Sequence, residues 1–118
     1  MKLDEILKIT NASTVYLSNP DFNIEYAFAS DLMSDALALV RSNCEKTILI
    51  TGLCNAQSLR TADMLDLRSI LYVRDKQINE TDLELAKELG MNIFKTQCTM
   101  YEACGLLYDK GLRPVNKD

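Results

Sequence analysis

Three times between residues 47 and 111, the chain passes from a short apolar run to a segment with helical spacing. The apolar runs cover residues 47–51, 69–73 and 91–95. After each run, apolar residues recur every three or four positions, the spacing of a helix with one buried face. The run at 47–51 is continuously β-branched and apolar, which is typical of a parallel strand covered by helices on both faces. We therefore predict an α/β domain with three successive strand–helix units.

Capping residues mark the ends of the predicted helices. Asn55 is placed to accept a hydrogen bond from the first turn of one helix. Two other helices open with a capping box, in which Thr is followed three residues later by Glu: the pairs are Thr81 with Glu84 and Thr99 with Glu102. Gly90 and Gly111 lie where left-handed residues close helices.

The first 46 residues continue the same pattern less strongly. We expect a short amphipathic helix at residues 3–9, a strand at 14–17, a turn at 18–21 and a strand at 24–28. Asp31, or Ser30 before it, is expected to cap the helix that follows. That helix should bury a stripe formed by Leu32, Ala36, Leu39 and Val40. The prediction is a single three-layer domain over residues 1–118, with a mostly parallel sheet flanked by helices and a loose tail from about residue 112.

Composition excludes several classes of protein. The 13 basic residues are scattered among 17 acidic ones, for a net charge of −4, so we expect no nucleic-acid partner. No apolar run is long enough to span a bilayer, and the amphipathic N-terminus is unlike a secretion signal, which indicates a cytoplasmic protein without membrane association. The four cysteines form no C-x-x-C pair and are expected to be reduced and mostly buried. Cys54, in a turn after a strand, is the candidate for an exposed reactive thiol.

The motifs of common catalytic sites are absent. The sequence contains neither a phosphate-binding P-loop nor the glycine fingerprint of a dinucleotide fold, and it has no histidine for a catalytic triad. Two carboxylate pairs, Asp31 with Asp35 and Asp63 with Asp66, share helix faces and could hold Mg²⁺ through waters, but such pairs more often mark a solvated face. We predict no catalytic residue, no bound metal and no cofactor.

A small anionic ligand is the binding hypothesis that the pattern supports. Ligands of open parallel sheets bind beyond the carboxyl ends of the strands, where helix N-termini also favour anions. The polar residues expected at that edge are Asp31, Thr51, Asn55, Arg74 and Thr99. Each has a structural alternative, because Asp31, Asn55 and Thr99 can act as helix caps and Arg74 as a solvated loop charge.

The last predicted helix is apolar over an unusually wide arc. Tyr101, Leu106 and Tyr108 widen the face formed by Met100, Ala103, Cys104 and Leu107. Because a helix that is apolar over most of its circumference is buried on two sides, we predict a homodimer that covers these three residues. The alternative is that the tyrosines lie on the surface with their hydroxyls in water.

Three segments resemble the DRTGG domain family. They are YAFASDLMSDALA (residues 26–38), ILITGLCNAQSLRTADMLDLRSILYVRDKQINETDLELAKELGMNIF (48–94) and TMYEACGLLYDKGL (99–112). The resemblance implies a small α/β domain similar to the N-terminal domain of HPr kinase/phosphorylase, without kinase activity. Related domains accompany phosphotransacetylases and lie between CBS domains of regulatory pyrophosphatases, where they look like dimerising or regulatory modules.

The sequence departs from the family pattern at two places. Glu25 stands where a glycine usually precedes the first segment, and Phe28 is an extra residue within it. The loop at residues 74–76 reads Arg-Asp-Lys where glycines are common, which removes close backbone approach to an anion but supplies a charge in Arg74.

These observations lead to a ranked expectation of function. The first hypothesis is a non-enzymatic regulatory or dimerisation module, and the second is a sensor of a small anionic metabolite or nucleotide. An enzyme relying on carboxylates or Cys54 ranks third, and a subunit that binds another protein remains open.

Overall fold

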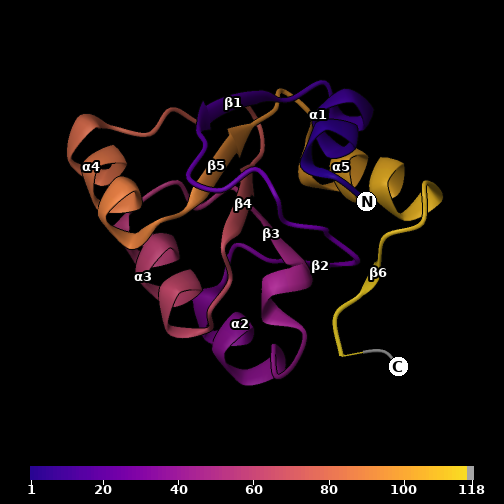
Figure 1. Cartoon of the computed structure of the whole chain (residues 1–118), viewed down its shortest axis with the longest axis horizontal. Coiled ribbons are helices and arrows are strands. Elements are labelled where there is room, and N and C mark those ends of the chain that lie inside the picture. Colours follow the sequence, from indigo (N-terminus) through magenta and orange to yellow (C-terminus); the bar gives the residue numbers. More distant parts are fainter. Residues whose placement is uncertain (117–118) are drawn as a thin grey trace.

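The computed structural model describes residues 1–116, which form one six-stranded sheet in the order β1-β5-β4-β3-β2-β6 (Figure 1). The strands are β1 (Ser13–Tyr16), β2 (Tyr26–Ala29), β3 (Thr47–Thr51), β4 (Ser69–Tyr72), β5 (Asn92–Lys95) and β6 (Arg113–Pro114). β1 pairs with β5 in the antiparallel sense, and every other pairing is parallel. The predicted mostly parallel sheet is confirmed.

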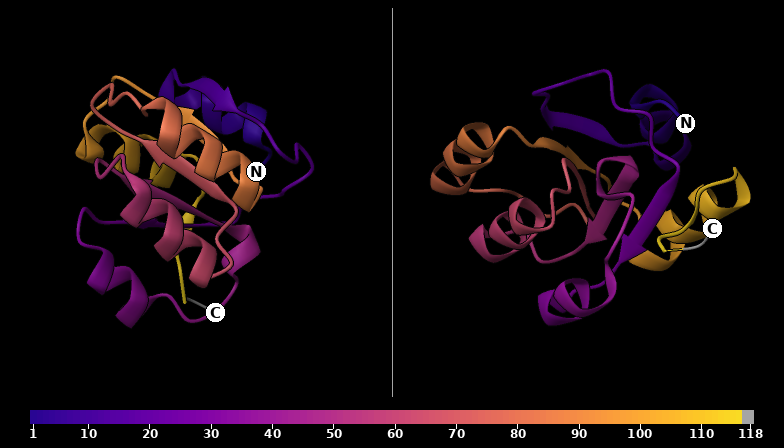
Figure 2. Two further views of the ribbon diagram at one scale, coloured as in Figure 1. Left: turned by 90° about the vertical axis from the view of Figure 1, so that its left-hand side faces the viewer. Right: turned by 60° about the horizontal axis from the view of Figure 1, so that its bottom comes forward.

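Helices cover both faces of this sheet. They are α1 (Leu3–Thr10), α2 (Met33–Leu39), α3 (Ala56–Met64), α4 (Glu80–Leu89) and α5 (Met100–Asp109), with a 3₁₀ turn at Cys44–Lys46. Figure 2 shows α2, α3 and α4 on one face and α1 with α5 on the other. The three-layer architecture is therefore as predicted. Within residues 1–116, no helix has the length and apolar character needed to cross a bilayer.

Alternate residues of the central strands divide the core between the two faces. Leu49 and Ile70 pack toward α2, α3 and α4, while Ile48, Ile50 and Leu71 pack toward α1 and α5. Every residue of β3 and β4 is buried. This explains why these strands lack polar alternation, because neither face of the central sheet meets water.

Several of the predicted helix ends are confirmed. The Asn55 side chain accepts a hydrogen bond from the Ser58 N–H, and Thr99 and Glu102 form the expected capping box. Gly90 ends α4 with a φ of 72°, in the left-handed region.

The predicted capping box at Thr81 and Glu84 is wrong. Helix α4 begins at Glu80, and its cap is Asn79, whose side-chain oxygen accepts from the Asp82 N–H at 2.8 Å. Asn is a strong cap residue, and capping there extends the helix by two residues beyond the start that Thr81 would set.

The predicted buried stripe of α2 is shifted. Met33, Ala36 and Val40 are buried, whereas Leu32 and Leu39 are 57% and 47% exposed. The helix begins at Met33, and it packs on the sheet with residues 33, 36 and 40 inward. This leaves leucines of α2 on the surface.

The segment after Gly111 is not a loose tail. The Arg113 N–H donates to the Glu25 carbonyl at 3.1 Å, and the Val115 N–H donates to the Ala27 carbonyl at 3.3 Å. Leu112 and Val115 are buried beside these bonds. The segment adds β6 to the edge of β2 because that edge offers backbone groups that would otherwise lack partners within the sheet. The last two residues of the expected tail, 117 and 118, lie outside the described residues.

Candidate functional site

Asp31, just after β2, links the carboxyl ends of β2, β3 and β4 through two hydrogen bonds and one ion pair. Its Oδ1 accepts from the Thr51 hydroxyl, at the end of β3, at 3.3 Å and from the N–H of the next residue, Gly52, at 2.6 Å. Its Oδ2 lies 3.4 Å from the Arg74 guanidinium, in the loop after β4. Asp31 is therefore not the cap of α2. Ser30 does not cap that helix either, since its hydroxyl accepts from the Leu32 N–H just before the first turn.

Arg74 reaches Asp31 from a loop with an unusual backbone. Arg74 and Asp75 have φ of 60° and 53°, in the left-handed region that glycine adopts most readily. Their N–H groups donate to the carbonyls of Cys98 and Thr96, each at 2.8 Å, which fixes the loop against the end of β5. The loop thus keeps a glycine-like backbone at the place where the family resemblance leads one to expect glycines.

Gly52 makes room for the Arg74 side chain. A Cβ at position 52 would lie 2.0 Å from Nη2 of Arg74 and 3.1 Å from Oδ1 of Asp31. A side chain at this position would therefore displace the guanidinium from the carboxylate. The sequence does not reveal this role of Gly52, because it depends on a contact with a residue 22 positions later.

The structure brings together three of the five predicted ligand residues. Asp31, Thr51 and Arg74 form one hydrogen-bonded cluster, while Asn55 and Thr99 use their side-chain oxygens to cap α3 and α5. The donors suited to an anion at this edge are the Gly52 N–H, the Thr51 hydroxyl and Arg74, and all three already bind the carboxylate of Asp31. Binding of an external anion at these residues stays a prediction.

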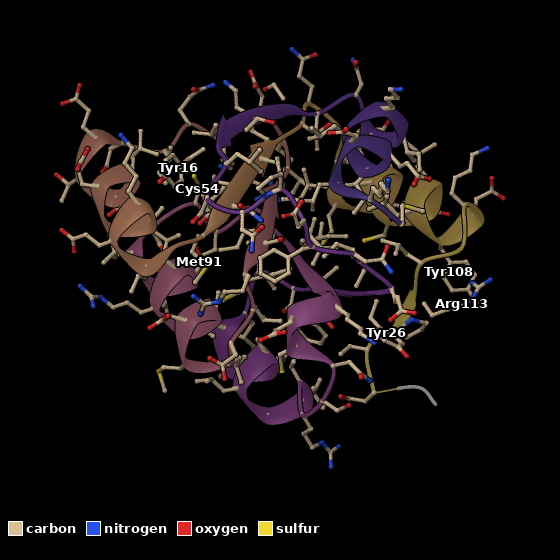
Figure 3. The ribbon with its side chains drawn as sticks, viewed as in Figure 1. Tyr16, Tyr26, Cys54, Met91, Tyr108 and Arg113 are labelled. Atoms are coloured by element: carbon tan, nitrogen blue, oxygen red, sulfur yellow. The ribbon has the colours of Figure 1, made fainter. Side chains whose placement is uncertain are left out.

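Cys54 lies in an environment that keeps its thiol protonated. Desolvation by burial, with the nearby Asp82 carboxylate adding to it, raises the pKa of Cys54 to about 11. Next to it, the hydroxyls of Ser58 and Tyr72 are 2.7 Å apart in the core, and burial raises the pKa of Tyr72 as well. A nucleophilic cysteine needs a lowered pKa, so this environment does not activate Cys54. Figure 3 labels Cys54 among the side chains of the domain.

One carboxylate of each acidic pair considered for Mg²⁺ is paired with an arginine. Asp31 pairs with Arg74, and Asp63 pairs with Arg68 at 2.9 Å. Across residues 1–116, His, Cys, Asp and Glu side chains form no cluster of three or more that could hold a metal ion.

The outer face of α5 exposes large apolar side chains. Tyr101 is 88% exposed, Tyr108 60% and Leu106 42%, whereas Ala103 and Leu107 of the same helix are buried against the sheet. The three residues predicted to form an interface thus lie on the surface of the single chain.

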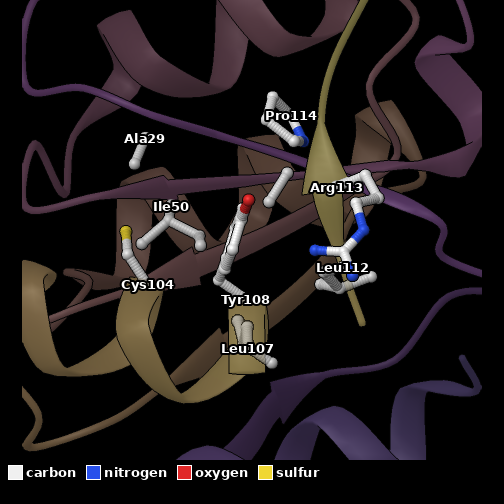
Figure 4. Close-up of a pocket in the computed structure, with 9 residues that line it drawn as sticks. Ala29, Ile50, Cys104, Leu107, Tyr108, Leu112, Arg113 and Pro114 are labelled. Atoms are coloured by element: carbon white, nitrogen blue, oxygen red, sulfur yellow. The ribbon is translucent and has the colours of Figure 1, made fainter. Parts of the chain in front are cut away.

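A mostly apolar hollow of about 150 Å³ lies between α5 and the strands β2 and β6 (Figure 4). It is lined by Ala27 and Ala29 of β2, Ile50 of β3 and Cys104, Leu107 and Tyr108 of α5, with residues 112–114 closing one side. The small side chains of β2 leave this space beside α5. The Arg113 guanidinium stacks over the Tyr108 ring, 4.9 Å from its centroid, at the rim.

Comparison with known proteins identifies the fold. The chain matches no protein-family model, and no curated protein is a recognisable relative. It is similar to the crystal structure of the CBS and DRTGG domains of the regulatory region of Clostridium perfringens pyrophosphatase, complexed with its activator diadenosine tetraphosphate. The TM-score is 0.67 at 19% sequence identity, and the match covers 98% of this chain and 48% of that chain. The present chain thus spans about half the length of its structural neighbour, and the likeness establishes the fold.

Proposed function

We propose that this chain is a regulatory module of the DRTGG type that acts without catalysis and self-associates through α5. The observation that carries the proposal is the exposure of Tyr101, Leu106 and Tyr108 on one helix beside an apolar hollow. The fold it shares with a pyrophosphatase regulatory region supports the regulatory part. We place the module in the cytoplasm, because its cysteines are free and its fold needs no disulfide.

Burial of α5 by a second chain explains the composition of this helix. Large apolar side chains that gather on one surface typically mark a contact site, whereas single exposed ones need no explanation. Tyrosine is also enriched in interfaces, because its ring is apolar and its hydroxyl can stay in water at the rim. A single helical contact is a small interface, so the proposed homodimer is a weak one that depends on concentration.

Light scattering as a function of concentration tests self-association. At tens of micromolar, we expect twice the mass of the chain, and we expect the Tyr101→Ser/Tyr108→Ser variant to be monomeric. The matched control is Leu37→Ser/Met64→Ser, which removes two exposed apolar side chains from α2 and α3. A monomeric wild-type chain at this concentration would refute the proposal. If the α5 variant and the control variant dissociate equally, α5 is not the dimer interface.

A sensor of a small anion is the second candidate. The observation that favours it is the gathering of Thr51, Gly52 and Arg74 around a carboxylate, a constellation that would also suit a phosphate. An incoming anion would have to replace Asp31 on these donors. A thermal-shift screen with nucleotides, dinucleotides, sugar phosphates and acyl phosphates tests it, since ligand at a hundred times its Kd stabilises by about 2.7 kcal/mol. The rise in melting temperature caused by the ligand should vanish in Arg74→Ala, and an unchanged rise would exclude Arg74 from the site.

A further inference from the structure

The apolar hollow beside α5 exists because one face of β2 carries only alanines. Ala27 and Ala29 pack on the side of the sheet that faces α1 and α5, next to Ile48 and Ile50 of β3. Alanine is depleted in strands, which favour larger β-branched side chains that fill the space under a covering layer. A hollow in a core forfeits packing contacts and is destabilising. Larger side chains at these two positions would close it, so the fold of the single chain does not require the hollow.

The size and lining of the hollow suit a small molecule. Its volume of about 150 Å³ is close to that of an apolar protein cavity that accepts benzene. Ile50, Leu107 and Leu112 are buried and form its floor, while the two alanines of β2 are half-buried and leave it open to solvent. The strongly polar groups of the lining are the Arg113 guanidinium and the Tyr108 hydroxyl.

Arg113 supplies a positive charge at the rim of the hollow. None of the ion pairs within residues 1–116 uses its guanidinium, which lies over the Tyr108 ring, 4.9 Å from the centroid. The neighbouring carboxylate of Glu25, whose backbone carbonyl accepts from the Arg113 N–H, is paired with Lys46 at 3.2 Å. Arginine presents N–H groups in a planar fork that matches a carboxylate. This charge therefore complements an anion placed at the rim.

We propose that the hollow binds the anion of a small carboxylic acid with an apolar body about the size of benzene. The body lies over Ile50 between β2 and α5, and the carboxylate pairs with Arg113. Figure 4 shows Cys104 and Arg113 at opposite ends of the lining, with Tyr108 between them. Sites for small molecules typically combine an apolar lining with a few polar groups that orient the ligand.

This site differs from the two that the proposed function considers. Its lining includes neither Asp31 nor Arg74, so it is separate from the candidate anion site at the ends of β3 and β4. The hollow lies within one chain, so the inference does not depend on self-association through α5.

NMR titration of the nitrogen-15-labelled chain with sodium benzoate tests the proposal. We expect saturable shifts of the amides of Ala27, Ala29 and Cys104, with a Kd of about 1 mM or tighter. Benzyl alcohol has nearly the same shape without the charge and should bind at least tenfold more weakly, because charge-assisted hydrogen bonds are the stronger ones. Equal affinity for the two probes would overturn the role of the charge. Shifts that stay linear in benzoate up to about 10 mM would overturn the site itself.

Two substitutions separate the charge from the space. Arg113→Gln should weaken benzoate at least tenfold and leave benzyl alcohol unchanged, and Arg113→Lys should restore part of the affinity. The matched control is Arg60→Gln, at an exposed arginine of α3. Ala29→Leu should fill the hollow and abolish binding of both probes, whereas Ala38→Leu, at an exposed alanine of α2, should not.

Melting curves establish that the Ala29→Leu variant is folded before it is titrated. Benzoate binding that survives in the folded Ala29→Leu chain would place the ligand outside the hollow and overturn the proposal. Because the Arg113 side chain is exposed, Arg113→Gln decides the proposal even if Ala29→Leu disturbs the fold. An unchanged benzoate Kd in Arg113→Gln would overturn it independently.

Discussion

Replacing Asp31 by alanine should destabilise the domain far more than a surface ion pair would suggest. The substitution removes the acceptor of the Gly52 N–H, at 2.6 Å, and of the Thr51 hydroxyl, at 3.3 Å. Both of these residues are buried, so their donors are left without the carboxylate at the end of the central sheet. The substitution also releases Arg74 from its partner at 3.4 Å.

The loss of unfolding free energy in Asp31→Ala can be worked out contact by contact. Hydrogen bonds to a charged group contribute roughly 1.5–3 kcal/mol to stability. The ion pair itself contributes about 0–1 kcal/mol, because both side chains are 46% exposed and solvent screens them. We expect Asp31→Ala to lower the free energy of unfolding by about 2–3 kcal/mol, and its melting temperature by roughly 6–12 °C. Asp31→Asn keeps an acceptor and Arg74→Ala removes only the ion pair, so each should lose about 1 kcal/mol or less.

Urea unfolding of the three variants at low and high salt tests this ordering. The loss in Arg74→Ala should disappear in high salt, whereas most of the loss in Asp31→Ala should remain, because hydrogen bonds to buried donors are screened little. Equal losses of unfolding free energy in Asp31→Ala and Arg74→Ala would show that the ion pair, and not the hydrogen bonds to Asp31, is what stabilises this edge. A free energy of unfolding for Asp31→Ala within about 0.5 kcal/mol of the wild type, a change typical of surface substitutions, would also refute a stabilising role of Asp31.

Further predictions concern three residues outside this cluster. Asn92 is fully buried and accepts from the Ser18 and Asn19 N–H groups at 2.8 and 2.9 Å, so Asn92→Ala should cost roughly 2–4 kcal/mol and abolish hydrogen-exchange protection of both amides. Gly90→Ala forces a side chain onto a φ of 72° and should cost about 1–2 kcal/mol in urea unfolding, whereas an unchanged midpoint would disprove strain at this cap. Burial raises the pKa of Cys54 to about 11, so its alkylation, followed by mass spectrometry, should be slow at pH 8 and rise about tenfold per pH unit up to pH 11. Because its folded pKa lies above the unfolded one, stability relative to Cys54→Ala should be highest below about pH 9 and fall between pH 9 and 11.

The candidate site was predictable only in part. Asp31, Thr51 and Arg74 could be placed together because the carboxyl ends of parallel strands share one edge of the sheet. Their hydrogen-bond partners could not be predicted from the sequence. Whether the Asp31 side chain caps its own helix or accepts from the Gly52 N–H depends on the position of the next strand.

The sequence alone determined the architecture of residues 47–111. Continuous apolar runs require strands covered on both faces, and the caps at Asn55, Gly90 and Thr99 set helix ends through contacts within four residues. Such local contacts need no knowledge of the rest of the chain.

Only the tertiary structure decided the features that join distant segments. β6 forms because residues 113–115 meet the open edge of β2, and the buried side-chain amide of Asn92 is hydrogen-bonded to the turn at residues 18–19. The packing of α2 on the sheet, with Met33, Ala36 and Val40 inward, decides which leucines of α2 reach the surface. The physical reason is common to all three: hydrogen-bond partners and buried faces are set by neighbours in space, and a periodic pattern along one segment does not identify them.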